Sequence, residues 1–180
     1  MLQPLTGLLG WCVMLELAVL TVLPGAVAFA AAMDLLTLRI PNRISGLMVL
    51  AFFPMAAVAG LGVSGVLDHI AAGVLMLLVG LLLFIPGWFG GGDAKLMAAS
   101  ALWIGPENLL LYMLYVAMAG GFIAMAFNSA RAVPLPRALL GEAWALRLHR
   151  RDAGIPYGLA LAAGALLVFP STVWFTGLAH

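Results

Sequence analysis

Apolar runs long enough to cross a membrane follow one another along almost the whole chain, and charged residues fall in the short breaks between them. Hydrophobic residues make up 65% of the 180 residues, charged residues only 8%, and the mean hydropathy is +1.16. In an ordinary soluble domain about a quarter of the residues are charged, so a chain with so few charged residues is not a soluble domain of that kind. The sequence predicts an all-α, polytopic protein embedded in a lipid bilayer.

Clusters of charged residues, Gly and Pro divide the chain into six apolar segments. A helix needs about 20 apolar residues to cross a membrane fully. These segments cover residues 10–33, 44–62, 66–85, 94–104, 109–127 and 155–178. The fourth segment is short and spans only about 17 Å at about 1.5 Å per residue, so its entry is expected below the membrane surface. We expect a single domain over residues 1–180, built as a bundle of six transmembrane helices.

The positions of the basic residues orient these segments. With six crossings, the connections 34–43, 86–95 and 128–154 lie on one side of the membrane, and they hold every Lys and Arg: Arg39, Arg43, Lys95, Arg131, Arg137, Arg147, Arg150 and Arg151. A five-crossing alternative divides this set, whereas positive residues concentrate on the cytoplasmic side. The loops are therefore predicted in the cytoplasm and both termini in the periplasm.

Two aspartates then come to the same level of the membrane. Asp34 ends the first apolar segment, and Asp93 precedes the fourth. Two carboxyl groups that meet can share a proton and activate water, which is the chemistry of aspartic proteases. Other roles stay open: Asp34 pairing with Arg39 or Arg43 at the interface, and Asp93 capping a helix or pairing with Lys95.

The residues around the aspartates are candidates for supporting roles. Gly90 and Gly92 permit the close approach of a substrate strand. Lys95 is expected to influence Asp93 or to meet an acidic side chain of the substrate. The segment Arg39-Ile40-Pro41-Asn42 is typical of a turn, in which Asn42 caps the second helix and a substrate contact is the alternative.

The connection 128–154 contains Leu140, Trp144 and Leu148 at a four-residue spacing. On a helix these side chains form one apolar stripe, which predicts a helix on the inner leaflet surface. The basic residues of this loop either hold the topology or contact an anionic segment of the substrate. Glu16 lies toward the outer end of the first segment, where helix packing or a position near the membrane interface is expected.

Several kinds of site are excluded. The single cysteine, Cys12, rules out an internal disulfide and a Cys-x-x-Cys site. No histidines have metal-ligand spacing, so neither a metal nor another cofactor is expected. The serines lack the Gly-x-Ser-x-Gly pattern of a nucleophile elbow. A membrane chain with a net charge of +1 gives no reason to expect a nucleic-acid partner.

Three segments taken together resemble the type IV prepilin peptidase (leader peptidase) family, and within it the small tight-adherence (Flp-type) branch. They are Asp34 followed by Arg39-Ile40-Pro41-Asn42, Gly90-x-Gly92-Asp93-x-Lys95-Leu96-Met97, and Ile155-Pro156-Tyr157-Gly158. The resemblance implies a six-helix bundle of the bacterial inner membrane with Asp34 and Asp93 as the catalytic pair. It implies an aspartic endopeptidase that cuts the leader from prepilins or pseudopilins after a glycine, at the cytoplasmic face.

The chain also departs from the larger members of that family. Those members carry an extra cysteine-containing region after the first span and also N-methylate the new terminus. Here the connection 34–43 is short and has no cysteine, so N-methyltransferase activity and bound zinc are not expected. Two other classes stay open: a small ion-coupled transporter, although no internal repeat supports it, and a non-catalytic scaffold of a pilus or secretion assembly.

Overall fold

The computed structural model describes residues 3–150 and 152–176, with the side chain of Ala18 and those from Leu20 onward. The side chains of Cys12 and Glu16 lie outside this description, as does the expected end of the last apolar segment at Leu178. The described residues form helices and no strand. The elements are α1 (Gln3–Thr37), α2 (Asn42–Val58), α3 (Val63–Phe84), α4 (Gly91–Ile104), α5 (Leu109–Ala132), η1 (Arg137–Leu139), α6 (Ala143–His149), α7 (Tyr157–Val168), η2 (Phe169–Ser171) and α8 (Val173–Thr176).

The first five predicted apolar segments each fall on one helix, whereas the sixth, residues 155–178, is divided among α7, η2 and α8. Among the described residues, three helices are long and apolar enough to cross a membrane, over Leu20–Thr37, Val63–Phe84 and Leu109–Ala132. Two more, Asn42–Val58 and Tyr157–Ser171, are apolar but shorter. The fourth segment forms a helix of 14 residues. The all-helical membrane class is confirmed, while six crossings and periplasmic termini stay predictions.

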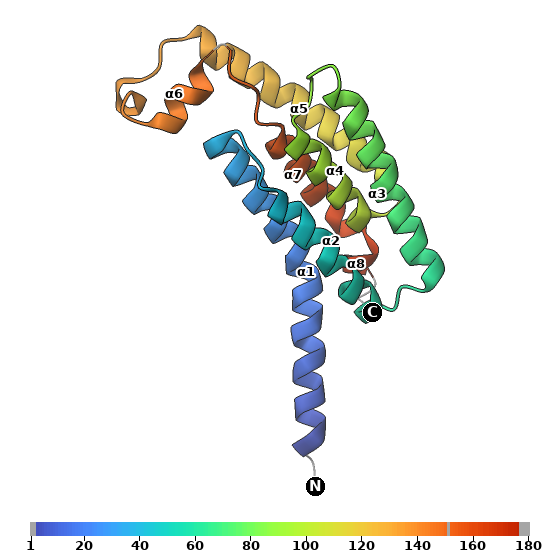
Figure 1. Cartoon of the computed structure of the whole chain (residues 1–180). Coiled ribbons are helices and arrows are strands. Elements are labelled where there is room, and N and C mark those ends of the chain that lie inside the picture. Colours follow the sequence, from blue (N-terminus) through green and yellow to red (C-terminus); the bar gives the residue numbers. More distant parts are fainter. Residues whose placement is uncertain (1–2, 151, 177–180) are drawn as a thin grey trace.

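Helices α4 and α7 lie in the middle of the bundle (Figure 1). Both α2 and α3 pack against α4, and α7 packs against α1 and α5. Small residues make the closest of these contacts possible: a methyl group on Gly80 of α3 would lie 2.8 Å from the Cβ of Ala94 on α4. Close approach at small residues is the usual basis of helix packing in membranes, where the hydrophobic effect between helices is absent.

An aromatic cluster joins the helices at the end of the bundle where α4 finishes. Phe52, His69, Trp103 and Trp174 stack edge-on or tilted, with neighbouring ring centroids 4.8 to 6.1 Å apart. The Trp103 indole N–H donates to the carbonyl of Met48 at 2.9 Å, and the Trp174 indole N–H donates to the carbonyl of Trp103. These contacts fix α2, α3, α4 and α8 to one another.

The connections that follow α1, α3 and α5 lie at the opposite end, which is the upper end in Figure 1. The connection between α2 and α3 lies at the lower end, near the last described residues. This grouping agrees with the arrangement expected from the basic residues, since the three connections at the upper end are the basic ones. Their location in the cytoplasm stays a prediction.

The basic connection after α5 differs from its predicted form. Helix α6 begins at Ala143, so Leu140 lies outside it and the predicted stripe of Leu140, Trp144 and Leu148 on one helix is wrong. Leu148 is buried, and Arg131 of α5 donates to the carbonyls of Leu148 and Gly154, both at 2.8 Å. The connection is therefore folded back onto the end of α5.

Candidate active site

Asp34 lies in the last turn of α1, with only 5% of its surface exposed. Because α1 packs along α7, the first turn of α7 reaches this carboxyl group. The backbone N–H of Gly158 donates to Asp34 Oδ2 at 2.7 Å. A methyl group at position 158 would lie 2.8 Å from that oxygen, so glycine is required there. The start of α7 thus orients the Asp34 carboxyl.

Asp93 is the third residue of α4, and Gly90 caps that helix. The Gly90 N–H donates to Asp93 Oδ2 at 3.0 Å. This bond satisfies one of the free N–H groups at the helix start and places the carboxyl at the positive end of the helix dipole. Asp93 Oδ1 is buried and has no hydrogen-bond partner within the described chain. One oxygen is anchored, and the other has no protein partner there.

The alternatives for the two aspartates fare differently. Within residues 3–150 and 152–176, Asp34 forms no ion pair with Arg39 or Arg43, and Asp93 forms none with Lys95, at a limit of 4.0 Å. Helix capping by Asp93 does occur, but the helix begins at Gly91, and Asp93 bonds back to the cap from inside the first turn. The capping bond uses only one oxygen of this carboxyl group. Capping therefore does not explain why the other oxygen is buried without a partner.

The two carboxyl groups interact electrostatically with each other. They come from two helices, α1 and α4, that contact each other directly. The sequence predicts Asp34 and Asp93 at the same level of the membrane. In the fold the last turn of α1, which holds Asp34, and the first turn of α4, which holds Asp93, both lie at the end of the bundle with the basic connections.

A tight turn between α1 and α2 brings these segments together. Leu38 directly follows α1 and has a φ of 53°, a conformation rare for a residue with a side chain. The chain then reverses so that Ile40 packs on Gly92 of α4. A methyl group at position 92 would lie 3.1 Å from the Cβ of Ile40 and 3.3 Å from its carbonyl oxygen. Gly92 therefore serves close packing beside the carboxyl pair.

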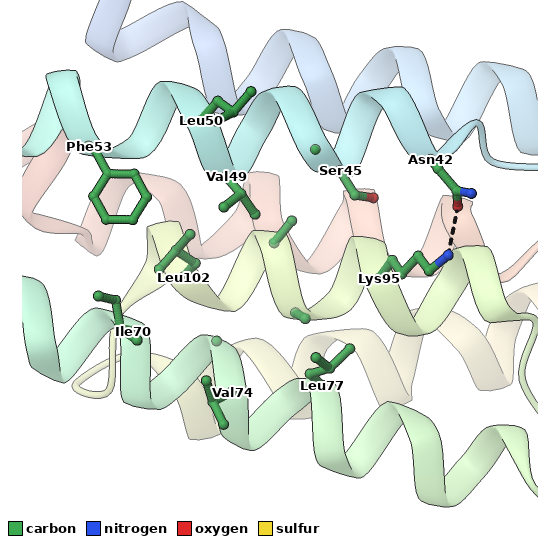
Figure 2. A pocket seen from close by; sticks show the side chains of 14 residues that line it. Asn42, Ser45, Val49, Leu50, Phe53, Ile70, Val74, Leu77, Lys95 and Leu102 are labelled. Carbon is green, nitrogen blue, oxygen red and sulfur yellow. Dashed lines mark hydrogen bonds between the residues drawn. The ribbon is translucent and has the colours of Figure 1, made fainter.

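The remaining predicted residues lie around this pair. Lys95 donates to the side-chain oxygen of Asn42 at 3.0 Å, which joins α4 to the start of α2 (Figure 2). Asn42 is the first residue of α2, with Pro41 at the cap position and no side-chain cap bond, so capping by Asn42 is wrong. Arg39 is exposed and lines a surface depression of about 540 Å³ with Thr37, Leu38 and Arg147.

No group of three or more His, Cys, Asp or Glu side chains in the described chain is arranged to hold a metal ion. The chemistry at this end of the bundle is that of two carboxyl groups, backbone N–H donors and one nearby ammonium group. A family model described as the type IV leader peptidase family matches residues 21–125, which is more than half of the chain. The chain belongs to the type IV leader peptidase family.

The matched region includes Asp34, Asp93 and the glycines before Asp93. The resemblance predicted from these residues is therefore confirmed at the level of the family, whose activity is that of a peptidase. No curated protein and no solved structure matches the chain.

Gly158 lies beyond the matched region, and its contact with Asp34 does not follow from the sequence. A backbone donor leaves no side-chain signature, because every residue except proline carries the same N–H. The available signal was Ile155-Pro156-Tyr157-Gly158, a motif of the leader peptidase resemblance that had no role assigned to it. Only the packing of α7 on α1 gives Gly158 its function.

Proposed function

We propose that the chain is a membrane aspartic endopeptidase that removes the leader peptide from type IV (Flp-type) prepilins or pseudopilins. Family membership supports the peptidase activity. The observation that carries the aspartic mechanism is that Asp34 and Asp93 are near enough to interact electrostatically, while each has one carboxyl oxygen held by a glycine N–H. Hydrolysis of a peptide bond needs an activated water and a polarised carbonyl, and two carboxyl groups supply both.

In this mechanism the two aspartates divide the roles of base and acid. Two neighbouring carboxyl groups cannot both ionise easily, so in this mechanism one of them carries a proton. The ionised carboxyl takes a proton from a water molecule, whose oxygen bonds to the scissile carbonyl carbon. The protonated carboxyl donates a hydrogen bond to the carbonyl oxygen. When the C–N bond breaks, the amine leaves with a proton returned by the pair.

We further propose that this site faces the cytoplasm from the inner membrane of a bacterium, with six crossings of the chain. The grouping of the basic connections at the end that holds both carboxyl groups supports this orientation, since positive loops stay on the cytoplasmic side. Gly90 and Gly92 form the edge over which the cleavage segment passes, and Arg39, Asn42 and Lys95 surround it.

The test is cleavage of a synthetic prepilin-like peptide by the purified full chain in detergent. We expect one cut after glycine, slowed at least about 100-fold in Asp34→Asn and in Asp93→Asn, since each change removes an acid–base group and keeps the shape. The matched control is Asp152→Asn, because Asp152 is exposed and bonds to Arg150. Near wild-type cleavage by either well-folded site variant would reject the aspartic mechanism.

A further inference from the structure

An apolar groove of about 640 Å³ runs along the side of the bundle between α2 and α3, with α4 as its floor (Figure 2). Val49 and Phe53 line it from α2, Val74 and Leu77 from α3, and Ala99 from α4. At one end the hydrogen bond between Lys95 and Asn42 crosses from α4 to α2. Asp93 lies two residues before Lys95 on another face of α4, so this end of the groove lies at the level of the carboxyl pair, although neither aspartate lines the groove.

The dimensions of the groove fit one face of a helix. Its lining on α2 runs from Asn42 to Phe53, which is about 17 Å at about 1.5 Å per residue. The volume divided by this length gives a mean cross-section of about 40 Å², about half that of a helix about 10 Å across. Gly46 lines the groove with nothing within 4 Å of the position of a Cβ atom, so another backbone can approach there.

One polar group on the groove favours a peptide helix over a lipid chain as the occupant. Lys95 bonds the neutral amide of Asn42, and no carboxylate of the described chain lies within 4.0 Å of its ammonium group. A helix with an acidic side chain at its start would pair with this ammonium group. Hydrocarbon would not.

We propose that this groove seats the apolar helix of the substrate, which enters beside Lys95 and pairs an acidic side chain with its ammonium group. The inference rests on the proposed function, because the peptide bond that Asp34 and Asp93 would cut is the one just before the substrate helix. Recognition of an apolar helix by an apolar groove is a common mode of peptide binding, in which one face of the helix supplies the contacts.

A substitution that fills the groove tests this proposal. Gly46→Trp places a large side chain in it, and Gly121→Trp is the matched control, because Gly121 is an exposed α5 glycine with nothing within 4 Å. Two substrates are compared: a peptide that includes the apolar helix and one that ends shortly after the cut. Gly46→Trp should raise KM for the long peptide about tenfold or more, while the short peptide is cleaved as by the wild type. Unchanged cleavage of the long peptide overturns the proposal.

Photocrosslinking tests occupancy without turnover. We would place p-benzoylphenylalanine at position 74, where Val74 is 52% exposed in the groove, and at position 122, where Phe122 of α5 is 74% exposed outside it. The long peptide should attach at position 74 alone and be displaced by unlabelled peptide. Adducts of lipid or of a second copy of the chain without peptide overturn the proposal. Peptide adducts without any cleavage by the wild type reject the proposed function and leave the groove assignment standing.

The ion pair is tested by a double change. Lys95→Met should raise KM for the long peptide when its helix begins with an acidic residue, and should have no further effect when that residue is glutamine. Since Lys95 lies near Asp93, KM and kcat are measured separately, and only KM reports the pairing. An equal rise in KM for both peptides would reject the ion pair.

Discussion

Ile40 packs on Gly92 so closely that a methyl group at position 92 would lie 3.1 Å from the Ile40 Cβ. Ile40 follows Asp34 across a tight turn, and Gly92 directly precedes Asp93. This contact joins the two segments that carry the proposed catalytic pair, and it thereby sets how near the end of α1 comes to the start of α4.

Gly92→Ala should slow peptide cleavage by about 10-fold to 100-fold, because a small displacement of reacting groups has effects of that size. Gly91→Ala is the control, since a methyl group at position 91 meets only Phe84, at an ordinary 3.7 Å. Cleavage rates and thermal unfolding of both variants are compared in detergent. Equal losses in the two variants would show that helix propensity at the start of α4, and not the contact with Ile40, is what matters.

Gly158→Ala should reduce cleavage at least about 100-fold with the family's other site residues intact, because the new methyl group displaces the general acid–base group Asp34. That methyl group would lie 2.8 Å from Asp34 Oδ2 and 2.9 Å from its Cβ. Gly154→Ala, where nothing lies within 4 Å, should retain wild-type activity. A fully active Gly158→Ala would mean that the orientation of Asp34 does not depend on α7.

Arg131→Lys should loosen the basic connection while keeping its charge. Lysine cannot reproduce the two bonds to the carbonyls of Leu148 and Gly154, and the local loss is expected to be about 1–2 kcal/mol. Limited proteolysis of residues 133–156 should become faster than in the wild type. Arg137→Lys serves as the control, and equal proteolysis of all three proteins would contradict the role given to Arg131.

Trp103→Phe should destabilise the bundle by about 2–3 kcal/mol, because it removes the bond to Met48 and leaves a small cavity. The aromatic cluster lies at the far end of α4 from Asp93, so the cleavage rate below the unfolding transition should not change. Trp88→Phe is the matched control, since Trp88 is 72% exposed. A fall in kcat without a fall in Tm would contradict this division between stability and activity.

The Arg150 guanidinium bonds both oxygens of Asp152, at 3.1 and 2.6 Å, and holds the pKa of that carboxyl below its ordinary value. A lowered pKa contributes stability at neutral pH that is lost as the pH falls through the lowered value. Because both groups are exposed, screening makes this contribution small. Asp152→Asn should therefore leave Tm at pH 7 unchanged, and a clear drop that persists in high salt would be inconsistent with a screened surface pair.

Much of the helical layout follows from the sequence, because apolar runs in a membrane protein have no alternative to helix once their backbone groups must be satisfied internally. The positions of Lys and Arg predicted that Asp34 and Asp93 lie at the same end of the bundle. The sequence did not predict where α4 begins. Gly91 and Gly92 precede the predicted fourth segment, residues 94–104, yet both belong to the helix, and Gly92 packs there on Ile40.

The sequence was least informative where polar contacts decide the structure. Leu140 and Leu148 have helical spacing, but the chain turns at Leu140 and Gly141, and α6 begins only at Ala143. The expected cap at Asn42 is absent because its side-chain oxygen accepts a bond from Lys95, which is 53 residues away. Long-range partners of this kind leave no periodic pattern, so local rules assign such residues to the nearest helix end.

Both carboxyl groups of the proposed pair are held by main-chain atoms, through the N–H groups of Gly90 and Gly158. A substitution scan changes side chains and leaves both of these donors in place, so it cannot weigh their contribution. Replacing the two amide linkages by esters in a semisynthetic chain would delete the donors and keep every side chain. The backbone conformation at Gly90 and Gly158, and not a neighbouring side chain, therefore sets how the two carboxyl groups are oriented.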